Sequence, residues 1–130
     1  VKVVLGKLKR RGVFLSIVTD APKTKAYQRL LGMGIEHYFK FVVAYEDTSS
    51  SKNTGLPFLR ALELLKKETP ELSCSEILMV GDSMERDIIP AKKFGFQTAL
   101  SKYGQRVPEP GNPDYEIADI TDLLKITEKL

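Results

Sequence analysis

The sequence contains a single cysteine, Cys74, among its 130 residues, so no internal disulfide can form. A reducing, intracellular compartment is the default for such a protein, and we therefore expect a cytoplasmic location. No apolar run approaches the roughly 20 residues that a membrane-spanning helix requires. The first residues also lack the small-residue cleavage site of a signal peptide. The sequence therefore predicts no membrane partner.

Clustered positive charge is lacking as well. The 20 lysines and arginines and the 17 acidic residues leave a formal net charge of +3, but the basic residues are spread along the chain. A nucleic-acid-binding surface usually shows a basic patch, so we expect a solvated lysine-rich surface and no nucleic acid partner. The apolar content of 42% is ordinary for a globular protein, and the length suits one domain over residues 1–130.

Segments of strand and helix character alternate along the chain. Short apolar runs predict buried strands over residues 13–18, 41–44, 77–80 and 97–100, with a small edge strand at 115–117. Helical spacing, proline starts and glycine stops predict helices over residues 1–11, 22–31, 57–69, 87–94 and 121–130. Thr121 is the expected N-cap of the last helix. Residues 48–55 and 104–113 are predicted to be loops.

The predicted strands are apolar throughout, which is typical of a parallel sheet with helices on both faces. The fold class is therefore α/β, a three-layer and Rossmann-like arrangement around a mostly parallel sheet. In such sheets, ligands bind at the carboxyl ends of the strands, where helix N-termini present donors to anions. The residues that follow each strand are therefore the candidates for a functional site.

Polar residues follow three of these strands. Thr19 and Asp20 follow the first, Lys52 follows the second across a loop, and Gly81-Asp82-Ser83 and then Asp87 follow the third. A lysine and a hydroxyl can bind phosphoryl oxygens. Mg²⁺ is usually held by one or two carboxylates and waters. In phosphoryl transfer the protein mainly positions the reacting groups and neutralises the charge of the phosphoryl group. This set of residues therefore favours that reaction.

Over nearly its whole length the chain resembles the haloacid dehalogenase (HAD) superfamily of hydrolases. The stretch Phe14-Leu-Ser-Ile-Val-Thr19 is similar to the second motif of that family, and Lys52 in Ser-Ser-Ser-Lys-Asn-Thr-Gly-Leu-Pro to the third. The stretch Ile77-Leu-Met-Val-Gly-Asp-Ser-Met-Glu-Arg-Asp87-Ile is similar to the fourth motif. The order and spacing of the three motifs make the resemblance specific.

The resemblance implies a role for each of these residues. Thr19 would hydrogen-bond the phosphoryl group, and Lys52 would neutralise it and orient the nucleophile. Asp82 would ligate Mg²⁺, and Asp87 would support the metal site directly or through another ligand. The implied activity is Mg²⁺-dependent hydrolysis of a small phosphorylated metabolite through an aspartyl-phosphate intermediate.

Each residue also has a purely structural interpretation. Thr19 could simply end a strand, Lys52 could be a solvated loop lysine, and Asp87 could N-cap the helix that follows it. Asp20 could line the site or cap the second helix, and we favour the cap. Ser83 has no assigned role beyond its place in the fourth motif.

The first motif of the family, Asp-x-Asp after a central strand, does not occur in this sequence. Its first aspartate is the nucleophile, so we expect the chain to be the C-terminal part of a HAD core and inactive by itself. By family topology, the absent strand lies between the strands that end at Thr19 and at Val80. We therefore expect a break in the sheet with costly unpaired edges. A second polypeptide could fill the break, the two strands could close up, or copies of the chain could pair.

The spacing of the motifs also bears on the cap domains that select substrates in this family. Between Thr19 and Lys52 there is room only for a helix and a strand, so no cap is expected there. A helical cap, if present, would precede Val1, as in relatives resembling phosphoglycolate phosphatases or haloacid dehalogenases. The sequence therefore does not identify the substrate.

Three other functions match parts of the sequence. An esterase of the Gly-Asp-Ser-Leu type would use Gly81-Asp82-Ser83, but Met84 replaces the leucine and the only histidine, His37, precedes the motif. A non-catalytic binding or assembly subunit would account for the absent first motif, whereas the retained site residues argue against it. A haloacid dehalogenase needs no metal, whereas the pair of Asp82 and Asp87 suits one.

Overall fold

The computed structural model describes residues 2–101 and 113–128. Its helices are α1 (Lys2–Arg10), α2 (Lys23–Met33), α3 (Tyr45–Thr48), α4 (Leu56–Glu68), α5 (Ile89–Lys93) and α6 (Asp122–Thr127). Its strands are β1 (Ile17–Val18), β2 (Val42–Val43), β3 (Leu78–Gly81), β4 (Gln97–Ser101) and β5 (Tyr115–Ile117). Short 3₁₀ turns lie at Glu36–Tyr38, Lys52–Thr54 and Cys74–Glu76, and a π-helical turn at Met84–Ile88. Strands and helices thus alternate, as the sequence predicts.

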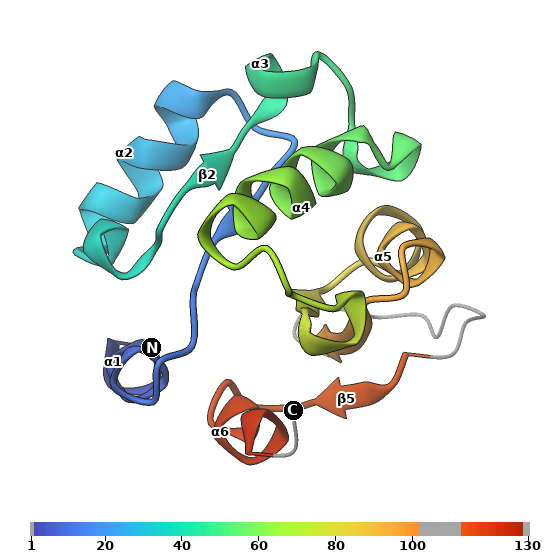
Figure 1. Ribbon diagram of the computed structural model, residues 1–130. Helices are drawn as coiled ribbons and strands as arrows, with labels where there is room; N and C mark the ends of the chain where they lie inside the picture. The colour runs from blue at the N-terminus through green and yellow to red at the C-terminus, as the bar shows by residue number, and fades with distance from the viewer. Residues whose placement is uncertain (1, 102–112, 129–130) are drawn as a thin grey trace.

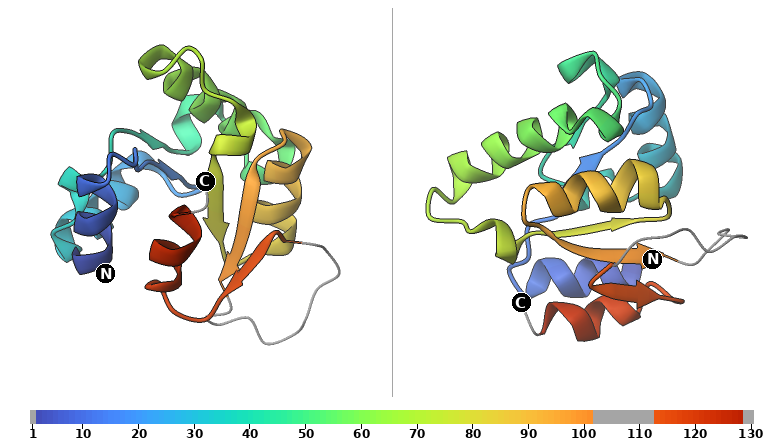
Figure 2. Two further views of the ribbon diagram at one scale, coloured as in Figure 1. Left: turned by 60° about the horizontal axis from the view of Figure 1, so that its bottom comes forward. Right: turned by 90° about the vertical axis from the view of Figure 1, so that its right-hand side faces the viewer.

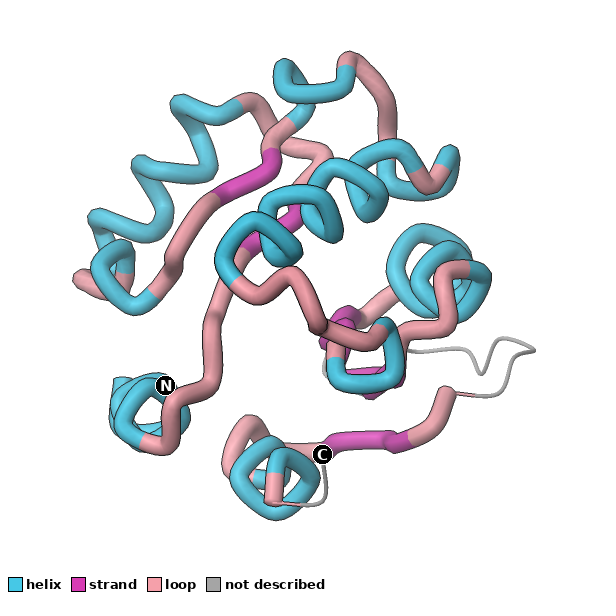
Figure 3. The backbone as a smooth tube through the Cα atoms, viewed as in Figure 1, coloured by secondary structure: helices cyan, strands magenta, loops and turns pink. Residues whose placement is uncertain are grey.

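The strands form two parallel sheets (Figure 3). The first sheet pairs β1 with β2, and the second has the order β3-β4-β5. In the second sheet Leu78 lies opposite Gln97, and Ala99 lies opposite Tyr115. Within residues 2–101 and 113–128, no strand joins β1 to β3. The predicted break in the sheet therefore lies between these two strands.

Helices cover both faces of the strands, which confirms the three-layer α/β fold (Figure 1, Figure 2). On one face, α1 and α2 pack against the first sheet through a cluster that includes Leu5, Leu30 and Val42. On the same face, α6 packs against the second sheet through Leu123 and Ile126. Each sheet therefore has its own apolar core on this side.

The opposite face is covered by α4 and α5, and here the core is shared by both sheets. Phe58 of α4 meets Phe96 edge-on, with 6.4 Å between the ring centroids. The same cluster includes Val18 of β1 and Met79 of β3. Burial of a large apolar side chain is worth roughly 1.5–3 kcal/mol. Helix α4 therefore holds the two sheets together on this face.

Most of the predicted helices and strands are confirmed. The carboxyl end of α2 shows why a helix end can be predicted from the sequence. The helix stops at Gly34, whose φ of +68° is left-handed and whose N–H bonds to the carbonyl of Leu31. Glycine adopts that conformation without the strain that a Cβ would cause, so it is the usual residue at this position. The described helices include none that is both long and apolar enough to cross a membrane.

Several predicted boundaries are wrong. Strand 13–18 is reduced to Ile17–Val18, which pairs with Val42–Val43 of β2. The predicted loop 48–55 contains the end of α3 and a 3₁₀ turn. The predicted N-cap position of Thr121 is confirmed, although its side chain makes no cap bond and its hydroxyl donates to Asp119. Most of the predicted loop 104–113 lies outside the described residues.

Candidate active site

The segments that follow β2 and β3 meet at one edge of the two sheets through Lys52 and Asp87. The ammonium of Lys52 donates a hydrogen bond to Oδ1 of Asp87, 35 positions away in the chain. The Lys52 side chain is 16% exposed and that of Asp87 is 3% exposed. A buried ion pair of this kind loses hydration, and further hydrogen bonds must offset the loss.

Asp87 receives such a bond from its own turn. Its Oδ2 accepts from the N–H of Ser83 at 3.2 Å. Ser83 is the N-cap of the turn, because its Oγ accepts from the N–H of Arg86 at 3.2 Å. The interpretation of Asp87 as an N-cap is therefore wrong, since the turn begins four residues earlier and Asp87 lies within it.

Gly81, the last residue of β3, leaves space for the Asp87 carboxylate. A Cβ placed on Gly81 would overlap the Asp87 side chain at its Cβ, Cγ and Oδ2 atoms. Its φ is not left-handed, so the requirement for glycine here comes from close approach and not from backbone conformation. Gly81 is thus part of what places Asp87 against Lys52.

Asp20, which follows β1, holds the backbone of Lys52, which follows the neighbouring strand β2. Its Oδ1 accepts from the N–H of Lys52 at 2.7 Å. The favoured interpretation of Asp20 as a helix cap is wrong. The N-cap of α2 is Pro22, and the N–H of Lys23 bonds to Oε1 of Glu46 at 2.8 Å. Asp20 therefore links the end of β1 to the turn that carries Lys52.

Thr19 lies beside this link. Its N–H donates to the carbonyl of Val43 at 2.9 Å, which continues the pairing of β1 with β2. Its Oγ1 accepts from the N–H of Ala21 at 3.1 Å. A hydroxyl that accepts one bond keeps its own hydrogen for donation, so Thr19 can donate to a ligand oxygen at this edge.

Asp82 is exposed, in contrast to Asp87. Its carboxylate takes no part in the bonds that join Lys52, Asp87 and Ser83. The described part of the chain contains no group of three or more histidine, cysteine or acidic side chains that could enclose a metal. Mg²⁺ needs only one or two carboxylates with waters, so an exposed carboxylate at this edge is a suitable ligand.

Asp47 also shapes the site, although it belongs to none of the sequence motifs that predict the site. Its carboxylate accepts from the N–H of Ala44 at 2.7 Å and from Nζ of Lys23 at 2.9 Å. The backbone hydrogen bond from Ala44, followed by the contact with Lys23, holds the pKa of Asp47 below its ordinary value of 3.8. An acidic residue three positions into a helix is the available sequence signal. Asp47 thereby fixes α3, which leads to Lys52.

The structure thus brings all six predicted site residues to one edge. Asp20, Lys52, Asp87 and Ser83 form a continuous chain of hydrogen bonds. Thr19 and Asp82 are covalent neighbours of this chain. One lysine cation, one hydroxyl donor and one exposed carboxylate at the ends of parallel strands can bind an anion together with a divalent cation.

Three similar proteins bear on the fold and the site. PpaX of Caldanaerobacter subterraneus subsp. tengcongensis, provisionally named a pyrophosphatase, is 36% identical over 129 residues, which are 97% of this chain and 56% of the relative. The glyceraldehyde 3-phosphate phosphatase of Pyrococcus abyssi is 33% identical over 129 residues, covering 96% of this chain and 52% of its own length. The crystal structure of YfnB from Bacillus subtilis, bound to magnesium, superposes with a TM-score of 0.81 at 26% identity, over 96% of this chain and 53% of that one.

The chain therefore spans about half the length of the curated relatives it matches. The overlap with these relatives covers both sheets and the edge where Lys52 meets Asp87. The esterase alternative does not agree with this fold family, and Ser83 acts as an N-cap in the structure. The sequence model of the haloacid dehalogenase-like hydrolases matches residues 1–101, and the chain belongs to that family.

Proposed function

We propose that the complete protein is a Mg²⁺-dependent phosphohydrolase that acts on a small phosphorylated metabolite. The observation that carries this proposal is the partly buried Lys52, held at the edge of the sheets by the Asp87 carboxylate and through its backbone by Asp20. A fixed cation at that edge suits the negative charge of a transferring phosphoryl group. The activity named for the Pyrococcus abyssi relative is of the same class.

Lys52 and Thr19 bind the phosphoryl oxygens in this proposal. Lys52 has three N–H donors, and its bond to Asp87 uses one of them. The other two can reach a phosphoryl oxygen and the attacking group. The hydroxyl hydrogen of Thr19 supplies a further donor from the end of β1. The two oxygens of the Asp87 carboxylate accept from Lys52 and from Ser83, so Asp87 orients the lysine.

Asp82 is the residue of this chain best suited to hold Mg²⁺, because its carboxylate is exposed beside the Lys52–Asp87 pair. Mg²⁺ would neutralise charge on the phosphoryl oxygens and fix their orientation. Asp87 supports the site by orienting Lys52 and the Asp82–Ser83 backbone. The nucleophilic aspartate belongs to a segment outside this sequence, and its phosphorylation and hydrolysis complete the reaction.

The direct test is a phosphate-release assay on the complete gene product. We expect hydrolysis of glyceraldehyde 3-phosphate, another small phosphate ester or inorganic pyrophosphate, abolished by EDTA and restored by Mg²⁺. Chloride or bromide release from a 2-haloacid without metal would instead establish a dehalogenase. A folded complete protein with neither activity would establish the non-catalytic subunit and contradict the proposal.

A further inference from the structure

A pocket of ≈ 360 Å³ lies at the amino ends of β1 and β2. Its walls are residues 12–15, which precede β1, residues 37–40, which precede β2, and Lys9 of α1. Thr19 and Lys52 follow the same two strands, so the pocket and the candidate active site lie at opposite ends of the first sheet. Pockets for small molecules usually have volumes of roughly 300–1,000 Å³, so this one is large enough for a small ligand.

Backbone hydrogen bonds hold the walls of the pocket together. The N–H of Lys40 donates to the carbonyl of Leu15 at 2.7 Å, which joins the two segments that lead into β1 and β2. The N–H of Val13 donates to the carbonyl of Leu8 at 3.1 Å and joins the first of these segments to α1. The pocket is therefore formed before any ligand arrives, which lowers the entropic cost of binding.

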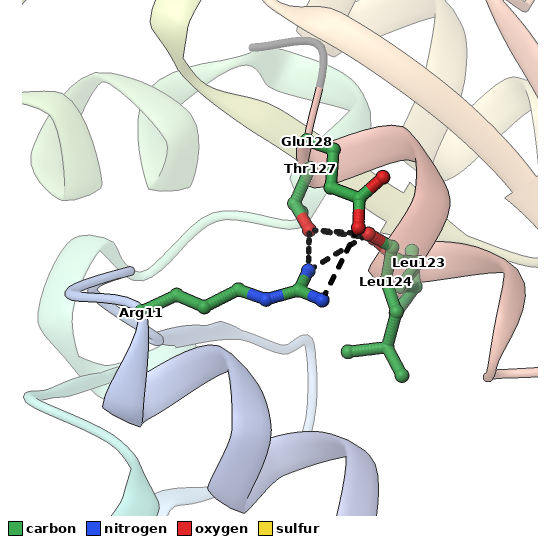
Figure 4. A network of polar contacts seen from close by, with 5 residues as sticks. All are labelled: Arg11, Leu123, Leu124, Thr127 and Glu128. Atoms are coloured by element: carbon green, nitrogen blue, oxygen red, sulfur yellow. Dashed lines mark hydrogen bonds and ion pairs between the residues drawn. The ribbon is translucent and has the colours of Figure 1, made fainter.

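The end of α1 beside the pocket is fixed to the last turn of α6 (Figure 4). The guanidinium of Arg11, just after α1, donates to the carbonyl of Leu124 at 2.8 Å and pairs with Glu128 at 3.4 Å. A cation is favourable at the carboxyl end of a helix, so this contact ties α1 to α6. The charge of Arg11 is therefore used at α6 and not in the pocket.

Lys9 and Lys40 line the pocket, and both side chains are exposed. Nζ of Lys9 donates to the carbonyl of His37 at 3.3 Å, which leaves its other N–H groups for a ligand. Nζ of Lys40 lies 5.2 Å from the centroid of the Phe14 ring. None of the described residues that line the pocket is acidic, and Oε1 of the neighbouring Glu36 lies 3.8 Å from Nδ1 of His37. The pocket is therefore positively charged and favours an anion.

Aromatic rings form much of the remaining surface. Phe14, Tyr38 and Phe39 line the pocket, and Phe14 is 48% exposed. The ring of His37 lies against that of Tyr38, with 4.2 Å between the ring centroids. Planar rings stack on such side chains or meet them edge-on, so an aromatic ligand suits this surface. An anionic group bound to Lys40 would bring an attached ring close to Phe14, because Lys40 lies over that side chain.

The pocket shares part of its lining with an apolar groove between the two sheets. Residues 13–15 and Phe39 line both, whereas Lys9, His37 and Lys40 line the pocket alone. An apolar ligand could therefore bind in either place, but a negatively charged ligand is favoured only where the two lysines lie. The charge of the ligand thus separates the two sites experimentally.

We propose that this pocket binds a small planar aromatic anion. Lys9 and Lys40 bind its anionic group, and Phe14 and Tyr38 contact its ring. Hydrogen bonds from a cation to an anion are about twice as strong as neutral ones, so the two lysines provide the selectivity for charge. The site lies at the other end of the first sheet from Lys52, and it does not depend on the proposed function.

Backbone amide chemical shifts, measured by NMR on the complete gene product, test this inference. The probe is naphthoate, a planar aromatic carboxylate, and its neutral match is naphthamide. A ligand of this size is expected to bind with a dissociation constant of about 1 mM or lower. Naphthoate should shift the amides of residues 12–15 and 37–40 saturably and leave those of Asp20 and Lys52 unchanged. It should bind at least about fivefold more tightly than naphthamide.

Substitution of single lysines tests the role of charge. Lys9→Gln and Lys40→Gln should each weaken naphthoate binding at least about fivefold and leave naphthamide binding within about twofold. Lys25→Gln is the matched control, because Lys25 is exposed on α2 and does not line the pocket. It should bind naphthoate as the unchanged protein does. Phe14→Leu keeps an apolar side chain but removes the ring, and should weaken the binding of both probes at least about threefold.

Four results would overturn the inference. The absence of saturable shifts at about 10 mM naphthoate would mean that no ligand of this class binds. Equal affinity for naphthamide would place the ligand in the apolar groove. Shifts centred on Asp20 and Lys52 would mean that the anion binds at the candidate active site. An equal loss of affinity in Lys25→Gln and Lys9→Gln would mean that the attraction is general to the surface charge.

Discussion

Lys52 and Asp87 form a buried ion pair that joins the segment after β2 to the turn after β3, and so connects the two sheets at their carboxyl edge. The pair is supported on both sides, by Asp20 at the backbone of Lys52 and by the Ser83 N–H at Asp87. The four residues come from three segments of the chain, because Ser83 and Asp87 lie in the same turn. The same few contacts therefore fix the geometry of the site and connect the two sheets.

Removing the lysine should destabilise the fold. Lys52→Met leaves the Asp87 carboxylate buried without its cation, and losing one partner of a buried pair typically costs about 3–5 kcal/mol. We expect the free energy of unfolding, measured by urea denaturation, to fall by about 3 kcal/mol. Lys66→Met, at an exposed position near the end of α4, should change it by less than about 0.5 kcal/mol. Equal effects of the two substitutions would contradict a buried pair.

Gly81→Ala should be destabilising although it adds only a methyl group. The new Cβ overlaps the Asp87 side chain, and overpacking of this kind costs about 1–3 kcal/mol. Gly32→Ala in α2 is the matched control, because a Cβ there meets nothing within 4 Å. Alanine is favoured over glycine in a helix, so the control should be stabilising by up to about 1 kcal/mol. Two changes of the same sign would show that Gly81 has no special role.

Asp20→Ala should release the backbone of Lys52. A backbone N–H that loses its acceptor in a half-buried position costs about 1–3 kcal/mol, and exchange of the Lys52 amide should accelerate. Asp20→Asn keeps an acceptor oxygen and should retain most of the protection. If the Lys52 amide exchanged equally fast in the unchanged chain, the Asp20 contact would not exist in solution.

Acid should remove the contribution of Asp47 to stability. Its pKa is lowered in the folded state, so the stabilisation is fully present above the unfolded value of about 3.8. It is lost as the pH falls through the lower folded pKa. The difference in unfolding free energy between the unchanged chain and Asp47→Asn should therefore be constant above about pH 5 and shrink below about pH 4. A difference that grew toward acid would have the wrong sign. Other acidic groups titrate in both proteins and cancel.

Local sequence patterns predict the strands, the order of the elements and the edge where the site lies, because apolar runs and glycine stops such as Gly34 act locally. The helix-cap interpretations of Asp20 and Asp87 are wrong, because the sequence shows that an acidic residue precedes a helix but not which N–H it accepts from. Asp87 bonds to a lysine 35 positions away, and no local pattern specifies such a contact.

The roles of Gly81 and Asp47 were missed for related reasons. The need for glycine at position 81 depends on how closely Asp87 folds back, which is a property of the packed turn. Asp47 lies in a segment predicted to contain no helix, so its place in the first turn of α3 was not recognised. The break in the sheet was predictable because it depends on an absent motif, whereas the Arg11 contact with α6 depends on tertiary structure.

The most direct test of the central claim is Mg²⁺-dependent phosphate release by the complete gene product carrying Asp82→Asn, compared with Glu68→Gln. Asp82 and Glu68 are both exposed, so neither substitution should disturb folding by more than about 0.5 kcal/mol. We predict that Asp82→Asn lowers kcat/KM by at least about 100-fold, as expected for a lost metal ligand. Glu68→Gln should leave kcat/KM unchanged. Equal activity of the two variants at saturating Mg²⁺ would contradict a metal-assisted phosphohydrolase site at this edge of the sheets.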